Sequence, residues 1–383
     1  MSGYEKYKDE IIDIRRHLHQ YPEPSFQEYE TAHFIREKLA QLEHCEIIEL
    51  TETGTVAVFN KGGKKRIGLR ADIDALPVKE ERTDIEFASK RDGLMHACGH
   101  DGHTAILLGA AMYFNDHIDE LEHEIHCIFQ HAEELIPGGA RELVATGYFN
   151  DFDFIYGHHL WATLPLGQID IKAGPASANS DIYSLTIQGK GGHASQPQLS
   201  VDPIVIGSQF INQIQSIVSR KTNPYDPVVV SNTVFHAGTK GAENVIPDKV
   251  TLGGSVRTTT EENRQHVKSE IEKVLKHLCE ASDATYEIEY TIGYDAVYND
   301  PKYVEWILGI AERDYPGQVV HEPPMMGGED FSAFNKVAPC VYTFIGTGSV
   351  GFDYAHHHPK FGLNEDGFKM GFEMFVKVAR EYE

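Results

Sequence analysis

Residues 96–134 read HACGHDGHTAILLGAAMYFNDHIDELEHEIHCIFQHAEE. The stretch begins with histidines around one cysteine and ends with two adjacent glutamates. Between them lie a run rich in alanine and leucine, residues 104–114, and an apolar segment, residues 124–130. The first run predicts a buried helix and the second a buried strand. A helix followed by a strand, with polar clusters before and after, indicates an α/β fold.

The same alternation continues on both sides of this stretch. Further helices are expected at residues 11–19, 31–42 and 139–146, and strands at 55–59, 66–70 and 152–157. Strands that alternate with helices favour a sheet covered by helices on both faces, with sites at the carboxyl ends of the strands. The side chains that follow predicted strands are Asp72, Asp74, Glu133, Glu134 and His159.

The middle third of the chain has a different pattern. Strands are expected at residues 181–188, 228–235, 249–256 and 286–292, and helices at 202–219 and 261–280. Four strands and two helices suffice for a separate α+β domain. Helix and strand return at 303–313 and 341–345, before a final helix from residue 365. We expect a discontinuous α/β domain, residues 1–179 and 293–383, with a mixed sheet flanked by helices, and an inserted domain, residues 180–292.

Composition limits the partners and the compartment. The chain has 383 residues, of which 41% are hydrophobic, enough for two packed domains. Its net charge of −24 repels phosphate backbones, so nucleic acid is not an expected partner. We find no apolar run of membrane-spanning length and no signal-peptide core, and the five cysteines are scattered. These features predict a cytoplasmic protein without a membrane partner.

Cys98 and His100 are the first candidate metal ligands. Thiolate and imidazole bind borderline divalent metals well, and the small residues Ala97 and Gly99 allow the backbone to turn. The helix that follows would further favour a thiolate through its dipole. The alternative is a histidine-rich loop with a buried free cysteine.

Three later segments add to this candidate site. Glu133 and Glu134 are adjacent carboxylates, which are costly at a strand end unless a cation neutralises one of them. One could bind the cation while the other accepts a proton from water, although a solvated acidic loop would look the same. Histidines also cluster at 158–159 and 356–358, where the alternatives are surface histidines and a polar loop. Together the segments predict a metal site.

These segments, in this order, resemble the M20 metallopeptidase/amidohydrolase family, in its aminoacylase branch. The matching segments are residues 15–19, 22–23, 70–77, 95–103, 132–134, 157–159, 189–194, 244–247, 328–331 and 357–359. They span nearly the whole chain, and their combination is specific although no single segment is. The resemblance implies a zinc-peptidase-like catalytic domain and an inserted dimerisation or lid domain.

The resemblance also implies a ligand set for two divalent ions, Mn²⁺ or Zn²⁺, with Co²⁺ or Ni²⁺ also compatible. The five implied ligands are Cys98, His100, Glu134, His159 and His357. Cys98 takes the bridging position, and His96 has no place in the set. Glu133 matches the general base. His193 matches a residue that polarises the scissile carbonyl and that many relatives take from the partner subunit of a dimer.

The chain departs from the family pattern at two of these positions. The family usually has an apolar residue where His158 stands, so the choice between His158 and His159 rests on the motif. The histidine run 356–358 is longer than usual, and His357 is chosen because it lies two positions before Pro359. A shift by one residue remains open at both positions.

Four further residues are weaker candidates. Asp74 could orient a ligating imidazole or cap a turn before Pro77. Arg257 could hold a substrate carboxylate and Asn244 could bind substrate through its amide, and the alternative for both is an ordinary surface or turn residue. Glu329 lines the pocket or caps the next helix.

The expected reaction is metal-dependent hydrolysis of the amide bond of N-acyl amino acids, with N-acetyl or aromatic acyl groups. The products would be a carboxylic acid and a free amino acid, and Glu133 would act as general base. The expected partners are this small substrate and a second copy of the chain, in a homodimer or a dimer of dimers through the inserted domain. The alternatives are a dipeptidase or carboxypeptidase, and a non-catalytic metal-dependent binding protein, which would not need Glu133.

Overall fold

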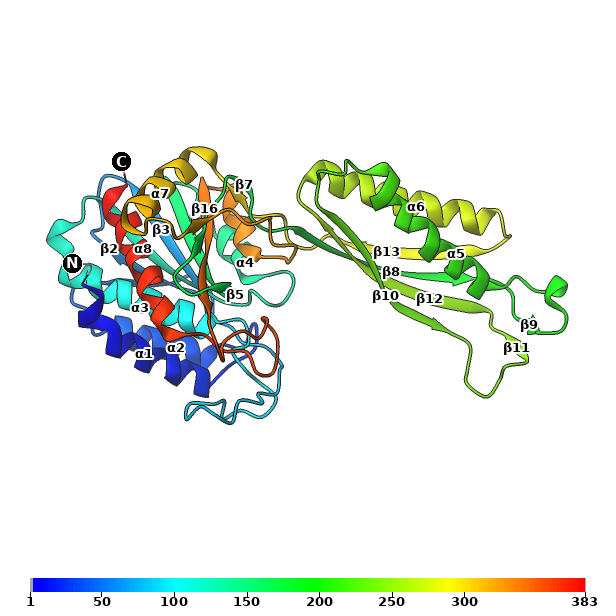
Figure 1. Ribbon diagram of the computed structural model, residues 1–383, viewed down its shortest axis with the longest axis horizontal. Helices are drawn as coiled ribbons and strands as arrows, with labels where there is room; N and C mark the ends of the chain where they lie inside the picture. Colours follow the sequence, from blue (N-terminus) through cyan, green and yellow to red (C-terminus); the bar gives the residue numbers. More distant parts are fainter. Residues whose placement is uncertain (1–2, 383) are drawn as a thin grey trace. The chain divides into compact units, whose positions relative to one another are not determined.

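The computed structural model describes residues 3–382 and divides the chain into two compact units (Figure 1). Unit 1 comprises Met1–Ala176, Val297–Pro323 and Asp330–Glu383, and unit 2 comprises Ser177–Ala296 and Pro324–Glu329. Residues 1–2 and 383 lie outside the described part of the chain. Unit 2 therefore begins three residues before the expected residue 180, ends four residues after the expected 292, and takes a second short segment.

Unit 1 is built on an eight-stranded mixed sheet, which confirms the predicted α/β class. Its strand order is β1-β2-β4-β3-β5-β16-β6-β15. In sequence the strands are β1 (Glu46–Glu49), β2 (Thr55–Phe59), β3 (Arg66–Asp72), β4 (Glu124–Gln130), β5 (Phe154–Pro165), β6 (Ile169–Asp170), β15 (Val319–Val320) and β16 (Cys340–Gly348). The parallel pairs β3–β4, β3–β5 and β5–β16 bring several carboxyl ends to one edge.

Helices pack against this sheet, and α3 is the most deeply buried of the long ones. The helices of unit 1 are α1 (Tyr4–Gln20), α2 (Tyr29–Leu39), α3 (His100–Asp116), α4 (Gly139–Ala145), α7 (Pro301–Asp314) and α8 (Phe368–Glu381). Single helical turns occur at Ile118–Glu120 and Glu365–Gly367, and a longer 3₁₀ segment at Asp330–Lys336. Helix α3 contacts α1, α8 and β3 (Figure 1). A Cβ atom at Gly109 would lie only 2.4 Å from the side chain of Ile11. The alanines and glycines of α3 therefore permit close helix packing.

Strand β5 corrects one expectation from the sequence. The predicted strand ended at residue 157, so His158 and His159 were expected in the loop that follows. In the structure β5 continues to Pro165, because its pairing with β16 includes both histidines: Thr343 lies opposite His158 and Phe344 opposite His159. The two histidines are therefore successive residues of one strand, and their side chains point to opposite faces of the sheet.

Unit 2 contains a four-stranded antiparallel sheet in the order β10-β12-β8-β13, with two long helices on one face (Figure 1). Its elements are β8 (Asn179–Gln188), β9 (Gly192–His193), a 3₁₀ turn (Pro197–Leu199), α5 (Pro203–Ser216), a π-helical turn (Ile217–Lys221), β10 (Val228–Ala237), β11 (Val245–Ile246), β12 (Lys249–Thr258), α6 (Glu261–Glu280) and β13 (Thr285–Thr291). Asp202 caps α5 and Thr260 caps α6 through side-chain acceptors. Buried apolar residues of β8 and β12 alternate with polar ones and form a separate core with the helices.

Unit 1 also contains two short strands, β7 (Gly174–Pro175) and β14 (Tyr298–Asn299), which pair with each other. Across residues 3–382, the helices lack the combination of length and apolar character that crossing a membrane requires.

Candidate metal centre

A sharp backbone turn separates Cys98 from His100, and each has a ligand atom within 4.8 Å of a carboxylate oxygen of Glu134. Gly99 has φ of 95°, the left-handed region that favours glycine, and immediately precedes α3. Both neighbouring side chains are buried. The Cys98 Sγ lies 3.5 Å from Nε2 of His159, which comes from β5. The loop before α3 and the middle of β5 thus meet at the thiol.

Asp74 holds His100 in one orientation. The Nδ1 of His100 lies 3.0 Å from both the carbonyl oxygen and Oδ1 of Asp74. The other carboxylate oxygen, Oδ2, accepts hydrogen bonds from Ser25 Oγ at 2.7 Å and from the Glu134 backbone N–H at 3.0 Å. Asp74 makes the contacts of a carboxylate that orients a ligating imidazole, and Nε2 of His100 is left to face the cluster.

Glu133 and Glu134 follow a backbone turn that is itself held in place. Ala132 has a φ of 52°, and its N–H donates to Oε1 of the buried Glu28 at 2.8 Å. After this turn, carboxylate oxygens of Glu133 and Glu134 and a ring nitrogen of His100 lie within 4.8 Å of one another. Glu133 is buried. The turn thus directs both carboxylates toward the same histidine.

The alternation of β5 separates His158 from His159. The ring of His158 packs 4.2 Å from that of Phe375 on α8, and burial lowers its pKa well below the usual value. Neither ring nitrogen of His158 has a hydrogen-bond partner in the structure. His159 points to the opposite face, toward Cys98, and its Nδ1 donates to its neighbour, the Leu160 carbonyl, at 2.9 Å. Of this pair, only His159 contacts the cluster.

The histidine run 356–358 splits in a similar way. The N–H of His357 donates to the Ala97 carbonyl at 2.8 Å, with His357 in a left-handed conformation, φ 67°. Its Nε2 then lies 3.3 Å from Oε1 of Glu134. His356 instead places Nδ1 3.7 Å from the Cys98 sulfur. Cys98, Glu134 and His357 form one potential ligand group, and Cys98, His159 and His356 form another.

The charge of this cluster fits a cation. Burial opposes a charged imidazole at His100, but Asp72 and Asp74 outweigh burial and raise the pKa of His100 to about 10. Burial and the carboxylates of Glu134 and Glu133 raise the pKa of the Cys98 thiol. The Nε2 of His100 lies 3.9 Å from Oε1 of Glu134, and both atoms are buried without a well-aligned hydrogen bond. Sulfur, imidazole and carboxylate donors with excess negative charge suit borderline divalent metals.

A supporting network beside the cluster was missing from the sequence predictions. The Nδ1 of His103 lies 2.6 Å from Oδ1 of Asp72, and its Nε2 accepts the Leu160 N–H at 2.9 Å. The other oxygen of Asp72 accepts from Arg70 at 2.6 Å. His103 lies one helical turn after His100, so spacing alone could have included it as a ligand. Both of its nitrogens are engaged, which makes it a support for β5.

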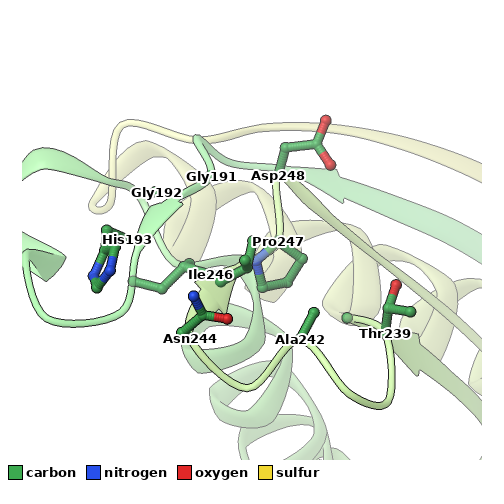
Figure 2. A pocket seen from close by; sticks show the side chains of 11 residues that line it. Gly191, Gly192, His193, Thr239, Ala242, Asn244, Ile246, Pro247 and Asp248 are labelled. Carbon is green, nitrogen blue, oxygen red and sulfur yellow. The ribbon is translucent and has the colours of Figure 1, made fainter.

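The remaining candidates lie in unit 2. His193, on β9, pairs with Val245 on β11, and the Asn244 carbonyl accepts the Ala194 N–H at 2.9 Å. Figure 2 shows His193 and Asn244 beside one hollow of the surface, and both side chains are exposed. The β9–β11 pair therefore brings together two candidates that are far apart in the sequence.

Arg257 and Glu329 have more enclosed surroundings. The half-buried Arg257 donates through Nη1 to its neighbour's carbonyl, that of Val256, at 3.1 Å and to the Asp181 carbonyl at 3.3 Å. Burial lowers the pKa of its guanidinium. Glu329 is buried and ends the Pro324–Glu329 segment of unit 2.

Comparison with known proteins adds independent information. Residues 68–381 match the peptidase family M20/M25/M40. The chain is 45% identical over 304 residues to an N-acyl-L-amino acid amidohydrolase of Geobacillus stearothermophilus, covering 78% of this chain and 81% of the relative. It is 38% identical over 371 residues to thermostable carboxypeptidase 1 of Saccharolobus solfataricus, covering 95% of this chain and 93% of the relative. Among solved structures, the YXEP protein of Bacillus subtilis, described as a dinuclear metal binding peptidase from the M20 family, is 35% identical with a TM-score of 0.85, covering 98% of each chain.

Proposed function

Because the chain belongs to the peptidase family M20/M25/M40, we propose that it is an amidohydrolase that cleaves the amide bond of N-acyl amino acids at a two-metal site. The observation that carries this proposal is the cluster in unit 1, where potential ligands come from four separate segments and two of them, His100 and Glu134, have ligand atoms within 4.8 Å of a carboxylate oxygen of the buried Glu133. The N-acyl-L-amino acid amidohydrolase relative supports the substrate class.

The proposed ligands are Cys98, His100, Glu134, His159 and His357, with Cys98 shared between the two ions. Cys98 is suited to that role because its sulfur belongs to two potential ligand groups. One group includes Glu134 and His357, and the other includes His159 and His356. When bound, Mn²⁺ or Zn²⁺ ions would supply Lewis acidity, which lowers the pKa of a water and polarises the acyl carbonyl. Asp74 contacts Nδ1 of His100 and would thereby keep Nε2 of His100 available to bind an ion.

Glu133 carries the proton in this proposal. Its carboxylate takes a proton from the attacking water and later delivers it to the nitrogen of the leaving amine. Glu133 is suited to this step because its oxygen lies within 4.8 Å of the ligands His100 and Glu134. Glu134 is needed to neutralise the cations, so the two adjacent carboxylates have separate tasks.

His193 is proposed to donate a hydrogen bond to the developing oxyanion. The backbone N–H of Ser195 donates to Nδ1 of His193 at 3.1 Å. Because Nδ1 accepts, the proton of the neutral imidazole is on Nε2, which is the donor that carbonyl polarisation requires. Asn244 lies beside the same hollow, which supports a joint role in binding substrate. Arg257 and Glu329 remain proposed contacts for the amino acid part.

Unit 2 is also proposed to carry a dimer contact. Strand β10 lies at the edge of the four-stranded sheet, and an exposed edge can pair with another chain. Val229, Val234 and Phe235 on this strand are 38–39% exposed. Light scattering on the purified protein should show a dimer or a dimer of dimers, and a strict monomer at micromolar concentration would contradict this proposal.

A substrate panel tests the proposed activity. Metal-loaded protein is incubated with N-acetyl and N-benzoyl amino acids and with dipeptides, and the release of free amine is measured. We expect hydrolysis of the N-acyl amino acids, and loss of activity after chelation with recovery on adding Mn²⁺ or Zn²⁺. Cleavage of peptides alone would favour the carboxypeptidase activity named for one relative. No release with either metal would favour a binding protein.

A further inference from the structure

His356 is fixed more firmly than an ordinary loop side chain. Its imidazole stacks on the indole of Trp161, with centroids 4.2 Å apart and planes at 28°. On another side it meets the buried ring of Phe361 at 4.8 Å. The ring of His159 lies edge-on at 5.1 Å. These contacts leave His356 with a single orientation next to the Cys98 sulfur.

The hydrogen bonds of His356 define which ring nitrogen carries the proton. The backbone N–H of Ala162 donates to Nε2 of His356 at 3.2 Å. A peptide N–H can only donate, so Nε2 must present its lone pair. The neutral imidazole then has its proton on Nδ1, and Nδ1 lies 3.7 Å from Sγ of Cys98. A nitrogen that carries a proton has no lone pair for a metal.

We propose that His356 is a positioning residue that donates an Nδ1–H···S hydrogen bond to the Cys98 thiolate and is not itself a metal ligand. The inference rests on the proposed function, because it takes Cys98 as the shared ligand of the two ions. It goes beyond that function by assigning a role to a histidine outside the five-residue ligand set. Ala162 fixes the tautomer and Trp161 fixes the plane of the ring.

The physical effect follows from the charges around the sulfur. Glu133 and Glu134 place carboxylates near a buried thiolate, and both repel its negative charge. A donated hydrogen bond stabilises a charged acceptor more than a neutral one. Metal binding displaces the proton of the Cys98 thiol, and without this hydrogen bond the metal-bound thiolate is less stabilised relative to the thiol, so the ions should bind less well. The sulfur should also donate more electron density to a bound metal, which lowers the energy of sulfur-to-metal charge transfer.

The first test compares three variants. His356→Phe keeps an aromatic ring between Trp161 and Phe361 but has no N–H donor, and His356→Asn restores an N–H near the Nδ1 position. His358→Phe is the matched control, because His358 is in the same loop and stacks on Tyr354, while its Nδ1 accepts from the Lys360 N–H. Each protein is titrated with Co²⁺, and the affinity, the stoichiometry and the near-ultraviolet sulfur-to-cobalt band are recorded.

We expect His356→Phe to bind two Co²⁺ ions roughly 10- to 100-fold more weakly, the usual loss when a partner of a ligand is removed. Its charge-transfer band should move to longer wavelength. His356→Asn should recover most of both properties, and His358→Phe should match the wild type. An unchanged band and affinity in His356→Phe would overturn the inference. Loss of one whole equivalent of metal at saturation would also overturn it, since His356 would then be a ligand.

The second test makes its measurement on the wild-type protein. Nitrogen-15 NMR of histidine-labelled wild-type protein with Zn²⁺ bound reports the tautomer of each ring, and His356→Asn identifies the signal. A proton on Nδ1 supports the proposal, and a proton on Nε2 contradicts it. If wild-type protein binds no Co²⁺ or shows no sulfur-to-cobalt band, the proposed metal site has failed together with this inference. If wild type shows both and the variants do not differ, only the role of His356 has failed.

Discussion

Glu133 and Glu134 are neighbours in the chain, and the proposed mechanism gives them different tasks. Glu133→Gln keeps the size of the side chain but removes the ability to accept a proton. We expect turnover of an N-acyl amino acid to fall by about 10²- to 10⁴-fold. Bound metal, measured by elemental analysis, should stay at the wild-type level. Glu134→Gln is the comparison, and it should lose metal as well as activity. Near-normal turnover of Glu133→Gln would remove Glu133 from the mechanism.

Glu28 is a second residue whose charge should have a measurable effect, in this case on stability. Burial and the neighbouring Asp74 raise the pKa of Glu28 from 4.5 to about 7. Between these pH values the folded protein binds more protons at this carboxyl than the unfolded chain does. Its contribution to the free energy of unfolding therefore falls as pH rises through this window.

Glu28→Gln isolates this effect, because glutamine resembles the protonated acid. Relative to wild type, the metal-free variant should gain stability as pH rises from 5 to 8, by up to about 3 kcal/mol. Urea unfolding at a series of pH values measures the difference. A difference that is constant with pH would show that Glu28 is ionised in the folded protein at all these pH values.

At the scale of an element, the alternation of β5 makes opposite predictions for two adjacent histidines. His158→Leu replaces two unpartnered buried nitrogens by methyl groups, so the free energy of unfolding should rise by about 1 kcal/mol. Metal content and activity should be retained. His159→Leu should lose at least one equivalent of metal and most activity. Thermal unfolding and metal analysis of both proteins check this, and the reverse pattern would mean that the proposed ligand is misassigned by one residue.

The same strand shows where sequence reasoning ends. Strands β2 and β4 and helix α6 have the ranges expected from the apolar pattern alone. The predicted end of β5 was wrong because its last residues are held by pairing with β16, which comes about 185 residues later and leaves no local signal. Cys98, His100 and the two glutamates stood out by residue type. The roles of His103 and His356 could not be separated from ligation, because they depend on which ring nitrogen is already bonded. The role of Asp72 depends in turn on its contact with His103.

At the scale of the whole molecule, the proposed dimer raises the question of which subunit His193 serves. His193→Ala should reduce turnover while bound metal is unchanged, since the proposed role is to polarise a carbonyl. Mixing this variant with Glu133→Gln, after dissociation and reassociation, then separates the two arrangements. If His193 serves the partner subunit, hybrid dimers contain one intact site and activity returns. If it serves its own subunit, the mixture stays as inactive as its components.

The position of β16 has a consequence for how the protein is made. This strand lies between β5 and β6 in the sheet of unit 1, yet it is synthesised after unit 2, as is His357. On the ribosome, residues 177–296 emerge as a nearly complete unit while the sheet of unit 1 still lacks an inner strand. We expect a nascent chain stalled at residue 330 to protect unit 2 from protease and to leave residues before 177 sensitive. Residues 340–357, which are translated after unit 2, would then complete both the fold of unit 1 and its proposed metal site.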